Sequence, residues 1–332
     1  GLMAQVRRAS ALDRALRHHD SRAVMAAQLT GGSKSGLGYE ALQAVAGRSA
    51  PFREMGILFW RGMTDVLRNP TLALLHLVFA TAIGLMVGFV YFEQQLDTAG
   101  AQNRVGAIFF AINLFAFTSV SAIDLVLPEK QVVEREICRH FYSPWAYMAS
   151  KLLVDALSLR LVPGVCFCTL FYWLMGLRRT AAAFTTFLWI FCTFNCLVGA
   201  LCLLFAALLG SAGKTVVVVN LLLLTFVLFS GFLAQKASVH WVLRWICYVS
   251  PIRFTWEALV VNELAPLTLM FTAGDLVAPP IKGTLFLSLL GVDADALTAN
   301  VIVLNCMYLI VAAGALVSMR TRLALVRSGW VL

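Results

Sequence analysis

The sequence contains few charged residues. Asp, Glu, Lys and Arg account for 13% of its 332 residues, whereas 60% are hydrophobic. A soluble globular chain carries about 25% charged residues, so this shortage excludes a protein whose whole surface faces water. Acids are scarcer than bases, 17 against 26, and the net charge is +9. Such a charge is typical of proteins that meet nucleic acid or anionic lipid, so the positions of the cations must decide between the two.

Residues that build enzyme and metal sites are also sparse. Of the five histidines, only His76 lies in a long apolar run. An enzyme embedded in a membrane needs several polar groups at one depth, so this scatter disfavours that alternative. Cys192 and Cys196 share a helix face, but buried apolar cysteines are the favoured interpretation over a metal site. We therefore expect no catalytic residue, no metal and no cofactor in this chain.

Long apolar runs are what the sequence has instead. A membrane crossing needs about 20 mainly apolar residues. The runs are continuous rather than alternating, which indicates helices that satisfy their own backbone in lipid. The sequence thus predicts an all-α integral membrane protein with six transmembrane helices. The six runs are Thr71–Phe92, Val105–Leu127, Leu152–Leu177, Ala181–Leu209, Val216–Leu233 and Ala299–Val317.

The cations fall mostly on one side of these predicted spans. They concentrate in the N-terminal 70 residues, in the loop between the second and third spans, and in the C-terminal tail. Because cytoplasmic loops carry an excess of Lys and Arg, we expect both termini to be cytoplasmic. The positive charge is then a signal of membrane topology, and no nucleic-acid partner is expected.

The stretch Gly210-Ser211-Ala212-Gly213-Lys214-Thr215 resembles the end of a phosphate-binding loop. The full pattern G-x-x-x-x-G-K-[ST] needs a glycine at position 208, where this chain has leucine, and it needs a surrounding soluble α/β domain. The stretch instead lies between two predicted spans. We interpret it as a tight glycine turn followed by a cytoplasmic lysine.

Segments outside the spans have distinct patterns. Residues 1–50 are rich in Arg, Ala and Gly and are predicted to be a cytoplasmic linker. Apolar residues at helical spacing in Pro51–Asn69 predict an amphipathic helix in the membrane interface. In the loop Pro128–Tyr147, a helix face is predicted for Val133, Ile137 and Phe141, with Ser143 as the N-cap of the next helix. A solvated connection and a docking helix both remain open for this loop.

The segment between the last two spans contains two short apolar stretches, Val239–Val249 and Ile252–Leu264, separated by Ser250-Pro251. Neither stretch is long enough to cross, so we expect re-entrant or interfacial helices. Cys247 is the only cysteine of this segment, which excludes a disulfide within it.

Several ionisable residues lie within or beside the spans. Asp124 is near the end of the second span, and Lys151 can pair with Asp155 at i, i+4. Arg160 is five residues beyond Asp155, about 140° around an α-helix, so a shared face is not expected. Functional roles are open, as intramembrane charges are costly, but side chains reaching to the interface are the simpler interpretation. Two further patterns predict helix contacts: the polar run Thr118, Ser119, Ser121 and the pair Gly84, Gly88.

Four stretches together resemble one family. They are Gly106–Lys130 (GAIFFAINLFAFTSVSAIDLVLPEK), Tyr142–Leu157 (YSPWAYMASKLLVDAL), Phe229–Leu233 (FSGFL) and Tyr248–Leu264 (YVSPIRFTWEALVVNEL). In this order they are similar to the membrane domain of the G subfamily of ABC transporters, the White-type and pleiotropic drug resistance group. The resemblance covers about residues 51–325.

This resemblance implies an ABC-2 type transmembrane domain over 51–332, with the fold of type V exporters. It implies a preceding ATP-binding domain, absent from this sequence, that would bind ATP and Mg²⁺. It further implies work as a homodimer or heterodimer of half-transporters, with 52–69 as the connecting helix. The loop 129–147 would contain the coupling helix, with Glu129, Glu134, Arg135 and Glu136 in the coupling region.

The resemblance also assigns roles to single residues. Spans two and five of both copies would line a central apolar cavity, in which Phe117 would stack on flat substrates. Other cavity positions would be Phe110, Asn113, Leu114, Leu223 and Val227, and Phe232 with Leu233 would plug the exit. Apart from the resemblance, the positions of Asp124, Asp155 and Arg160 within the predicted spans make them the candidate intramembrane charges.

The chain departs from multidrug members of the family at three of these positions. The plug begins with Phe232, Leu114 replaces an asparagine, and Leu223 replaces an aromatic residue. Drugs, sterols and lipids therefore all remain candidate substrates for ATP-driven export by alternating access, most simply at the plasma membrane. A separate ABC-2 permease subunit, served by an ATPase on another chain, is the alternative.

Overall fold

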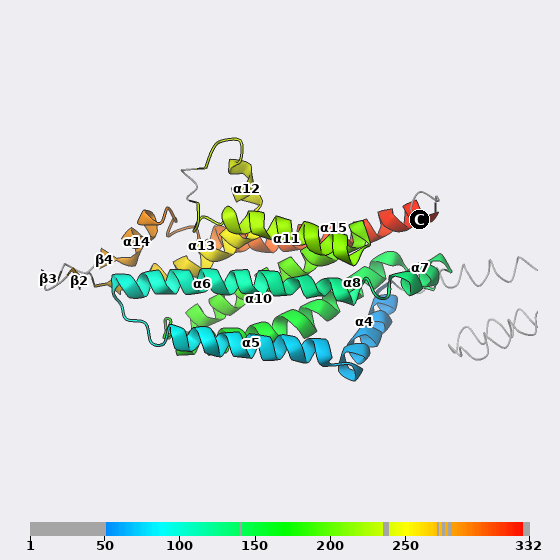
Figure 1. The fold of residues 1–332 in the computed structure, drawn as a ribbon, viewed down its shortest axis with the longest axis horizontal. Helices are drawn as coiled ribbons and strands as arrows, with labels where there is room; N and C mark the ends of the chain where they lie inside the picture. The colour runs from blue at the N-terminus through cyan, green and yellow to red at the C-terminus, as the bar shows by residue number, and fades with distance from the viewer. Residues whose placement is uncertain are drawn as a thin grey trace, which may run out of the picture. The chain divides into compact units, whose positions relative to one another are not determined.

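A computed structural model describes residues 51–139, 141–234, 239–270, 272–273, 276–277 and 281–327. The predicted linker 1–50 lies outside these residues. The described part is helical apart from four short strands, and most of its long helices run side by side (Figure 1). The all-α prediction is confirmed.

The elements follow one another in this order. The first half contains α4 (Pro51–Arg68), α5 (Thr71–Val90), α6 (Thr98–Thr118), the 3₁₀ helix η1 (Ser119–Leu125), α7 (Lys130–Cys138), α8 (Pro144–Val154), the π-helix η2 (Asp155–Leu161) and α9 (Val162–Leu174). The second half contains α10 (Ala181–Leu209), α11 (Ala212–Leu228), α12 (Arg244–Val249), α13 (Pro251–Leu264), α14 (Gly283–Leu289) and α15 (Leu297–Arg327).

Two antiparallel strand pairs lie between α13 and α14, at the end of the molecule opposite α4 and α7 (Figure 1). One pair is formed by β1 (Thr268–Leu269) and β4 (Ile281–Lys282), and the other by β2 (Thr272–Ala273) and β3 (Leu276–Val277). We call the two ends of the helix bundle the strand end and the α7 end.

Five helices of the described residues are long and apolar enough to cross a membrane. They are Thr71–Val90, Thr98–Leu125, Pro144–Leu174, Ala181–Leu209 and Leu297–Arg322. The remaining predicted span, Val216–Leu233, corresponds to α11, which has 17 residues and begins and ends earlier than predicted. That length is at the lower limit for a crossing helix.

The helices of the bundle pack closely where the sequence has small residues. Gly84 and Gly88 of α5 face Leu170 and Leu174 of α9. A Cβ at Gly88 would lie 2.7 Å from the Leu174 Cβ, closer than real Cβ atoms approach. The predicted contact role of this glycine pair is therefore confirmed, and it follows the small-residue rule of membrane helix packing.

The turn predicted at Gly210 is confirmed. Gly210 ends α10 with φ +62°, a left-handed conformation that favours glycine. The Arg322 guanidinium occupies the space in which a Cβ of Gly210 would lie. The Thr215 hydroxyl donates to the Ser211 carbonyl oxygen at 2.7 Å. The stretch is thus a packed helix junction.

The segment before the last helix partly matches its prediction. Ile252–Leu264 lies in α13, whose residues are all buried, as in a re-entrant segment and unlike a helix on an exposed interface. The stretch Val239–Val249 is helical only from Arg244, in α12. The Ser250 hydroxyl caps α13 by accepting from the Arg253 amide, and Pro251 occupies the first turn.

Candidate functional site

The predicted cavity residues of the second span lie along one side of α6. Phe110, Asn113, Leu114 and Phe117 follow the i, i+3/i+4, i+7 spacing of a helix face. Phe110 is 44% exposed, and the other three are half-buried. The Asn113 amide donates to the Phe109 carbonyl oxygen at 2.7 Å, while its own buried carbonyl oxygen has no partner in the described residues. This is an apolar, partly open face with one spare hydrogen-bond acceptor.

The two predicted cavity positions of α11 differ in how far their side chains are buried. Leu223 is fully buried in the helix packing, whereas Val227 is half-buried. The exposed large hydrophobic residues of this helix are Val217, Val218, Leu221, Leu224 and Leu228. Leu223 therefore supports the wall of the bundle in this conformation and does not reach its exposed surface.

The predicted plug follows directly after α11. Gly231, at φ +90°, turns the chain so that Phe232 packs on α6 and α13. The Phe232 ring lies 4.5 Å from the Phe109 ring and 5.7 Å from the Trp256 ring, measured between centroids. Leu233 is 57% exposed. Phe109 and Trp256 had no signal in the sequence beyond their aromatic character, and the packing reveals both as partners of Phe232.

The predicted coupling residues tie α7 to its neighbours. Glu129 accepts from the Lys151 ammonium of α8 at 2.8 Å. Glu136 forms an ion pair with Arg61 of α4 at 3.3 Å and accepts from the Tyr142 hydroxyl at 2.7 Å. Burial and the Glu136 carboxylate raise the pKa of Tyr142. Burial lowers the pKa of Arg61, but the attraction of Glu136 outweighs it, so that pKa is raised.

Two further links run from α7 to the ends of α10 and α15. The Glu134 carboxylate lies 3.4 Å from the Arg322 guanidinium, which also donates to the Ala207 carbonyl oxygen at 3.1 Å. The Lys130 ammonium donates to the Gly210 carbonyl oxygen at 3.1 Å. Both cations lie at the carbonyl end of α10, where positive charge is favourable. Arg135 is exposed.

The helix face predicted in the loop Pro128–Tyr147 was partly wrong. Val133 and Ile137 are buried as predicted, but α7 ends at Cys138 and Phe141 is 67% exposed. The Ser143 hydroxyl does not cap α8; it donates to the Glu54 carboxylate of α4 at 2.9 Å. The contact with α4 therefore replaces the local cap.

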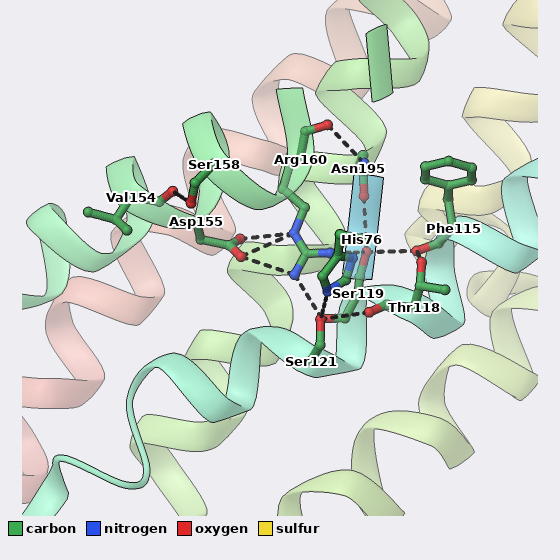
Figure 2. Close-up of polar contacts among 10 residues, drawn as sticks. All are labelled: His76, Phe115, Thr118, Ser119, Ser121, Val154, Asp155, Ser158, Arg160 and Asn195. Atoms are coloured by element: carbon green, nitrogen blue, oxygen red, sulfur yellow. Dashed lines mark hydrogen bonds and ion pairs between the residues drawn. The ribbon is translucent and has the colours of Figure 1, made fainter. Parts of the chain in front are cut away.

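A buried polar cluster centres on Arg160 (Figure 2). The Arg160 guanidinium lies 3.0 Å from the Asp155 carboxylate and donates to the Ser119 hydroxyl at 3.1 Å. Ser119 in turn donates to the Asn195 side-chain oxygen at 3.0 Å. All four of these residues are at most 2% exposed. Nearby, the Ser121 hydroxyl lies 2.7 Å from His76 Nε2.

The Asp155–Arg160 pair overturns the prediction that these residues do not share a face. That prediction assumed 100° per residue, but residues 155–161 form a π-helix. Its i→i+5 hydrogen bonds bring residues five apart into register. Lys151 consequently pairs with Glu129 rather than with Asp155. Arg160 is buried by protein and does not reach to the interface, whereas Asp124 is exposed.

The cluster confirms that Ser119 and Ser121 mediate helix contacts. Sequence reasoning missed Asn195, which joins α10 to the cluster, and Gly199, which leaves room for the Asp155–Arg160 pair. An Asn within an apolar run was the one available signal. His76 was noted as the histidine of an apolar run, and its partner Ser121 explains its presence there.

Two ion pairs that involve α13 were not predicted from the sequence. Arg104 is 3% exposed and lies 3.6 Å from Glu263, which also accepts from the Arg178 amide. Arg253 lies 2.7 Å from Glu257. Burial raises the pKa of Glu263, against the lowering effect of the Arg178 amide and of Arg104. These charges brace α6, α13 and the start of α10 rather than facing solvent.

The sequence of the chain matches a known protein family and several known proteins. The sequence pattern of ABC-2 type transporters matches residues 53–264. The chain is 33% identical over 208 residues to the broad substrate specificity ATP-binding cassette transporter ABCG2 of Mus musculus, a match that covers 61% of this chain and 31% of that protein. It is 28% identical over 245 residues to ABC transporter G family member 24 of Dictyostelium discoideum, covering 74% and 21%.

A third relative, a probable ATP-dependent permease of Saccharomyces cerevisiae, is 28% identical over 224 residues, which cover 67% of this chain and 21% of that protein. The chain thus spans less than a third of the length of these relatives. The family pattern begins in α4, includes the α6 face, α7 and the Arg160 cluster, and ends with α13. The chain therefore belongs to the ABC-2 type transporter family, is a multi-pass membrane protein, and is similar to the membrane domain of G-type ABC transporters.

Proposed function

We propose that this chain is the permease half of an ATP-driven exporter that moves hydrophobic compounds, such as drugs, sterols or lipids, across a membrane. Family membership and the G-type relatives support the transporter assignment. The half-open apolar side of α6, with aromatic residues and one unpaired acceptor, suits a large hydrophobic substrate. Phe110, Asn113, Leu114, Phe117 and Val227 would contact it, with Leu223 behind them.

The observation that carries the proposal is the set of links that α7 makes. Its charged residues hold α4, α8, the end of α10 and the end of α15 at once. A displacement of α7 would therefore reach several membrane helices together. We infer that α7 receives the motion of a nucleotide-binding domain through its exposed side, which includes Arg135. ATP and Mg²⁺ would bind in that domain, since the Gly210–Thr215 junction does not fit a nucleotide.

The assembly would be a homodimer, or a heterodimer with another half-transporter, with the α6 faces of both copies lining the cavity. Residues 1–50 would connect the nucleotide-binding domain to the membrane domain 51–332. Both termini would be cytoplasmic, because the α7 end carries the excess of cations. The membrane would be the plasma membrane. Phe232 and Leu233 would close the exit on the opposite side.

Phe117→Ala tests the substrate contact. In the full-length protein that carries this chain, the variant should lower substrate-stimulated ATP hydrolysis about tenfold across flat polycyclic compounds, because loss of stacking and apolar burial costs about 1–2 kcal/mol. Phe89→Ala is the matched control, since this phenylalanine of α5 is 64% exposed and lies outside both the α6 face and the loop 129–147. Unchanged stimulation by every compound in the Phe117→Ala variant would contradict the contact.

A further inference from the structure

A groove at the α7 end contains charges that the transport proposal does not use. It lies between α4, the start of α5, the η1–α7 segment and α8. A wider chamber has a volume of about 500 Å³ and a narrower one about 150 Å³. The two are continuous, because both are lined by Gly62, Asp65, Glu129 and Lys151.

The two chambers differ in the charges of their walls. The wider chamber is lined by three cations, Arg61, Arg68 and Lys151, with Asp65 and Glu129. The narrower chamber is lined by the acids Asp65, Asp124 and Glu129, with Lys151 as its cation. The groove therefore runs from a cationic part to an anionic part.

Some of these charges are already satisfied and others are not. Lys151 is paired with Glu129, and Arg61 with Glu136. Among the described residues, Asp65, Asp124 and Arg68 form no ion pair or side-chain hydrogen bond. The described residues hold no group of three or more His, Cys, Asp or Glu that could bind a metal ion. These two carboxylates and this guanidinium are exposed, so they can contact a ligand that carries both signs of charge.

The groove lies at the depth of lipid headgroups. Leu72 and Ala73, which line the narrower chamber, are at the start of the spanning helix α5. The hydrocarbon core is about 30 Å thick, and the headgroup regions begin where spanning helices end. Trp60 and Val132 line the wider chamber and are 73% and 50% exposed, so acyl chains could pass along apolar side chains. Exposed Phe52, Ile57 and Leu67 make α4 suited to the same interface.

We propose that this groove binds a phospholipid whose headgroup combines a phosphate with a primary ammonium, as in phosphatidylethanolamine. The phosphate lies in the wider chamber near Arg68, and the ammonium in the narrower one near Asp65 and Asp124. A primary ammonium donates charge-assisted hydrogen bonds to carboxylates, whereas a choline group has no N–H to donate. A serine headgroup brings a third carboxylate toward two acids, which repel it. The site goes beyond the transport proposal and does not depend on it.

The test measures the lipids that the full chain retains. The protein is reconstituted in bilayer discs of equal parts phosphatidylethanolamine, phosphatidylcholine and phosphatidylserine, released in mild detergent, and its bound lipids are counted by native mass spectrometry. We expect phosphatidylethanolamine to be enriched about tenfold over the other two, the factor that one charged hydrogen bond supplies. The double variant Asp65→Asn/Asp124→Asn should lose this preference.

Two further variants separate the site from general effects. Arg68→Gln should weaken retention of phosphatidylethanolamine and phosphatidylcholine alike, because both carry the phosphate. Asp295→Asn, an exposed acid in the segment between α14 and α15, should leave retention unchanged. Equal retention of all three lipids by the unaltered chain would overturn the proposal, as would a protein segment that fills the groove and excludes lipid. Loss of preference in Asp295→Asn to the same degree would also overturn it.

Discussion

At the scale of single residues, the charged groups that cost most free energy to bury lie where neighbouring helices contact one another. Arg160 and Asp155 are buried among apolar helices, yet the guanidinium is satisfied by Asp155, Ser119 and the Ser119 carbonyl oxygen. A buried charge without a partner costs several kcal/mol, so these residues must remain together. Their positions on η1 and η2 make the cluster a fixed point between two irregular helix segments.

Replacing Arg160 alone should destabilise the membrane domain strongly. Arg160→Met leaves Asp155 buried and unpaired, which costs about 3–5 kcal/mol. The double variant Asp155→Asn/Arg160→Met removes both charges and should recover much of that loss. Thermal unfolding of the detergent-purified chain measures the difference. Equal stability of the single and the double variant would contradict the claim that Asp155 is buried and depends on Arg160 as its partner.

A second residue-scale prediction concerns Gly88. Gly88→Ala would place a Cβ 2.7 Å from the Leu174 Cβ, so α5 and α9 must move apart, at a cost of about 1–3 kcal/mol. The matched control is Gly106→Ala on α6, where a Cβ meets nothing within 4 Å. That variant should be neutral or stabilising by about 0.5–1 kcal/mol, since alanine favours the helix. Equal melting temperatures for the two variants would refute the close α5–α9 contact.

At the scale of elements, α7 and the far end of α15 form a junction that neither helix makes alone. Glu134 and Arg322 are 188 positions apart in the chain but 3.4 Å apart in space. Arg322 also binds the carbonyl end of α10. The junction therefore connects the loop after the second span to the last helix, and we expect motion of α7 to pass through it.

Charge reversal tests this junction. Glu134→Arg places two cations together and should reduce transport per ATP hydrolysed several-fold in the full-length protein, because α7 separates from α10 and α15. The reciprocal double variant Glu134→Arg/Arg322→Glu restores an ion pair and should recover the ratio. Asp295→Arg is the control, an acid-to-cation change at an exposed position between α14 and α15, away from α7. Transport and hydrolysis that fall in parallel in Glu134→Arg, without rescue in the double variant, would show a merely structural contact.

The elements differ in how far the sequence predicted them. Apolar runs predicted the long helices and α4, because burial in lipid or protein demands continuous apolar length. The prediction that Asp155 and Arg160 do not share a helix face was wrong. One π-helical turn changes which residues align, and no local sequence pattern indicates such a turn. The end of α7 at Cys138 was missed for a similar reason: Phe141 continued the apolar spacing after the helix had ended.

The candidate site was predictable only in part. The cavity residues of α6 came from the family resemblance and their role stays a prediction; the structure adds that the four positions lie along one side of the helix. Leu223 and Leu224 are adjacent leucines that the sequence does not distinguish. Only the packing shows that Leu223 is buried and Leu224 is exposed. The partners of Phe232 and of Glu134 come from helices far along the chain, so tertiary contacts alone could identify them.

At the scale of the whole molecule, the described helices combine a half-open apolar side on α6, an aromatic contact between Phe109 and Phe232, and a charged α7 held to four neighbours. α7 lies at one end of the bundle and the strands lie at the other, with α6 extending between them (Figure 1). The order fits a machine in which force enters at the α7 end and a hydrophobic substrate leaves past Phe232. The paired charges Arg104–Glu263 and Arg253–Glu257 stiffen the strand end, where that exit would open.

The most direct test of this account is ATP-dependent transport by the full-length protein that carries this chain. Inside-out membrane vesicles containing it would be loaded with a panel of fluorescent hydrophobic compounds, including a sterol and a phospholipid, and accumulation would be followed with ATP and with a non-hydrolysable analogue. The account predicts ATP-dependent accumulation of at least one compound, reduced by Phe117→Ala and unaffected by Phe89→Ala. Equal accumulation with ATP and with the analogue for every compound would contradict the claim that this chain is the permease half of an ATP-driven exporter.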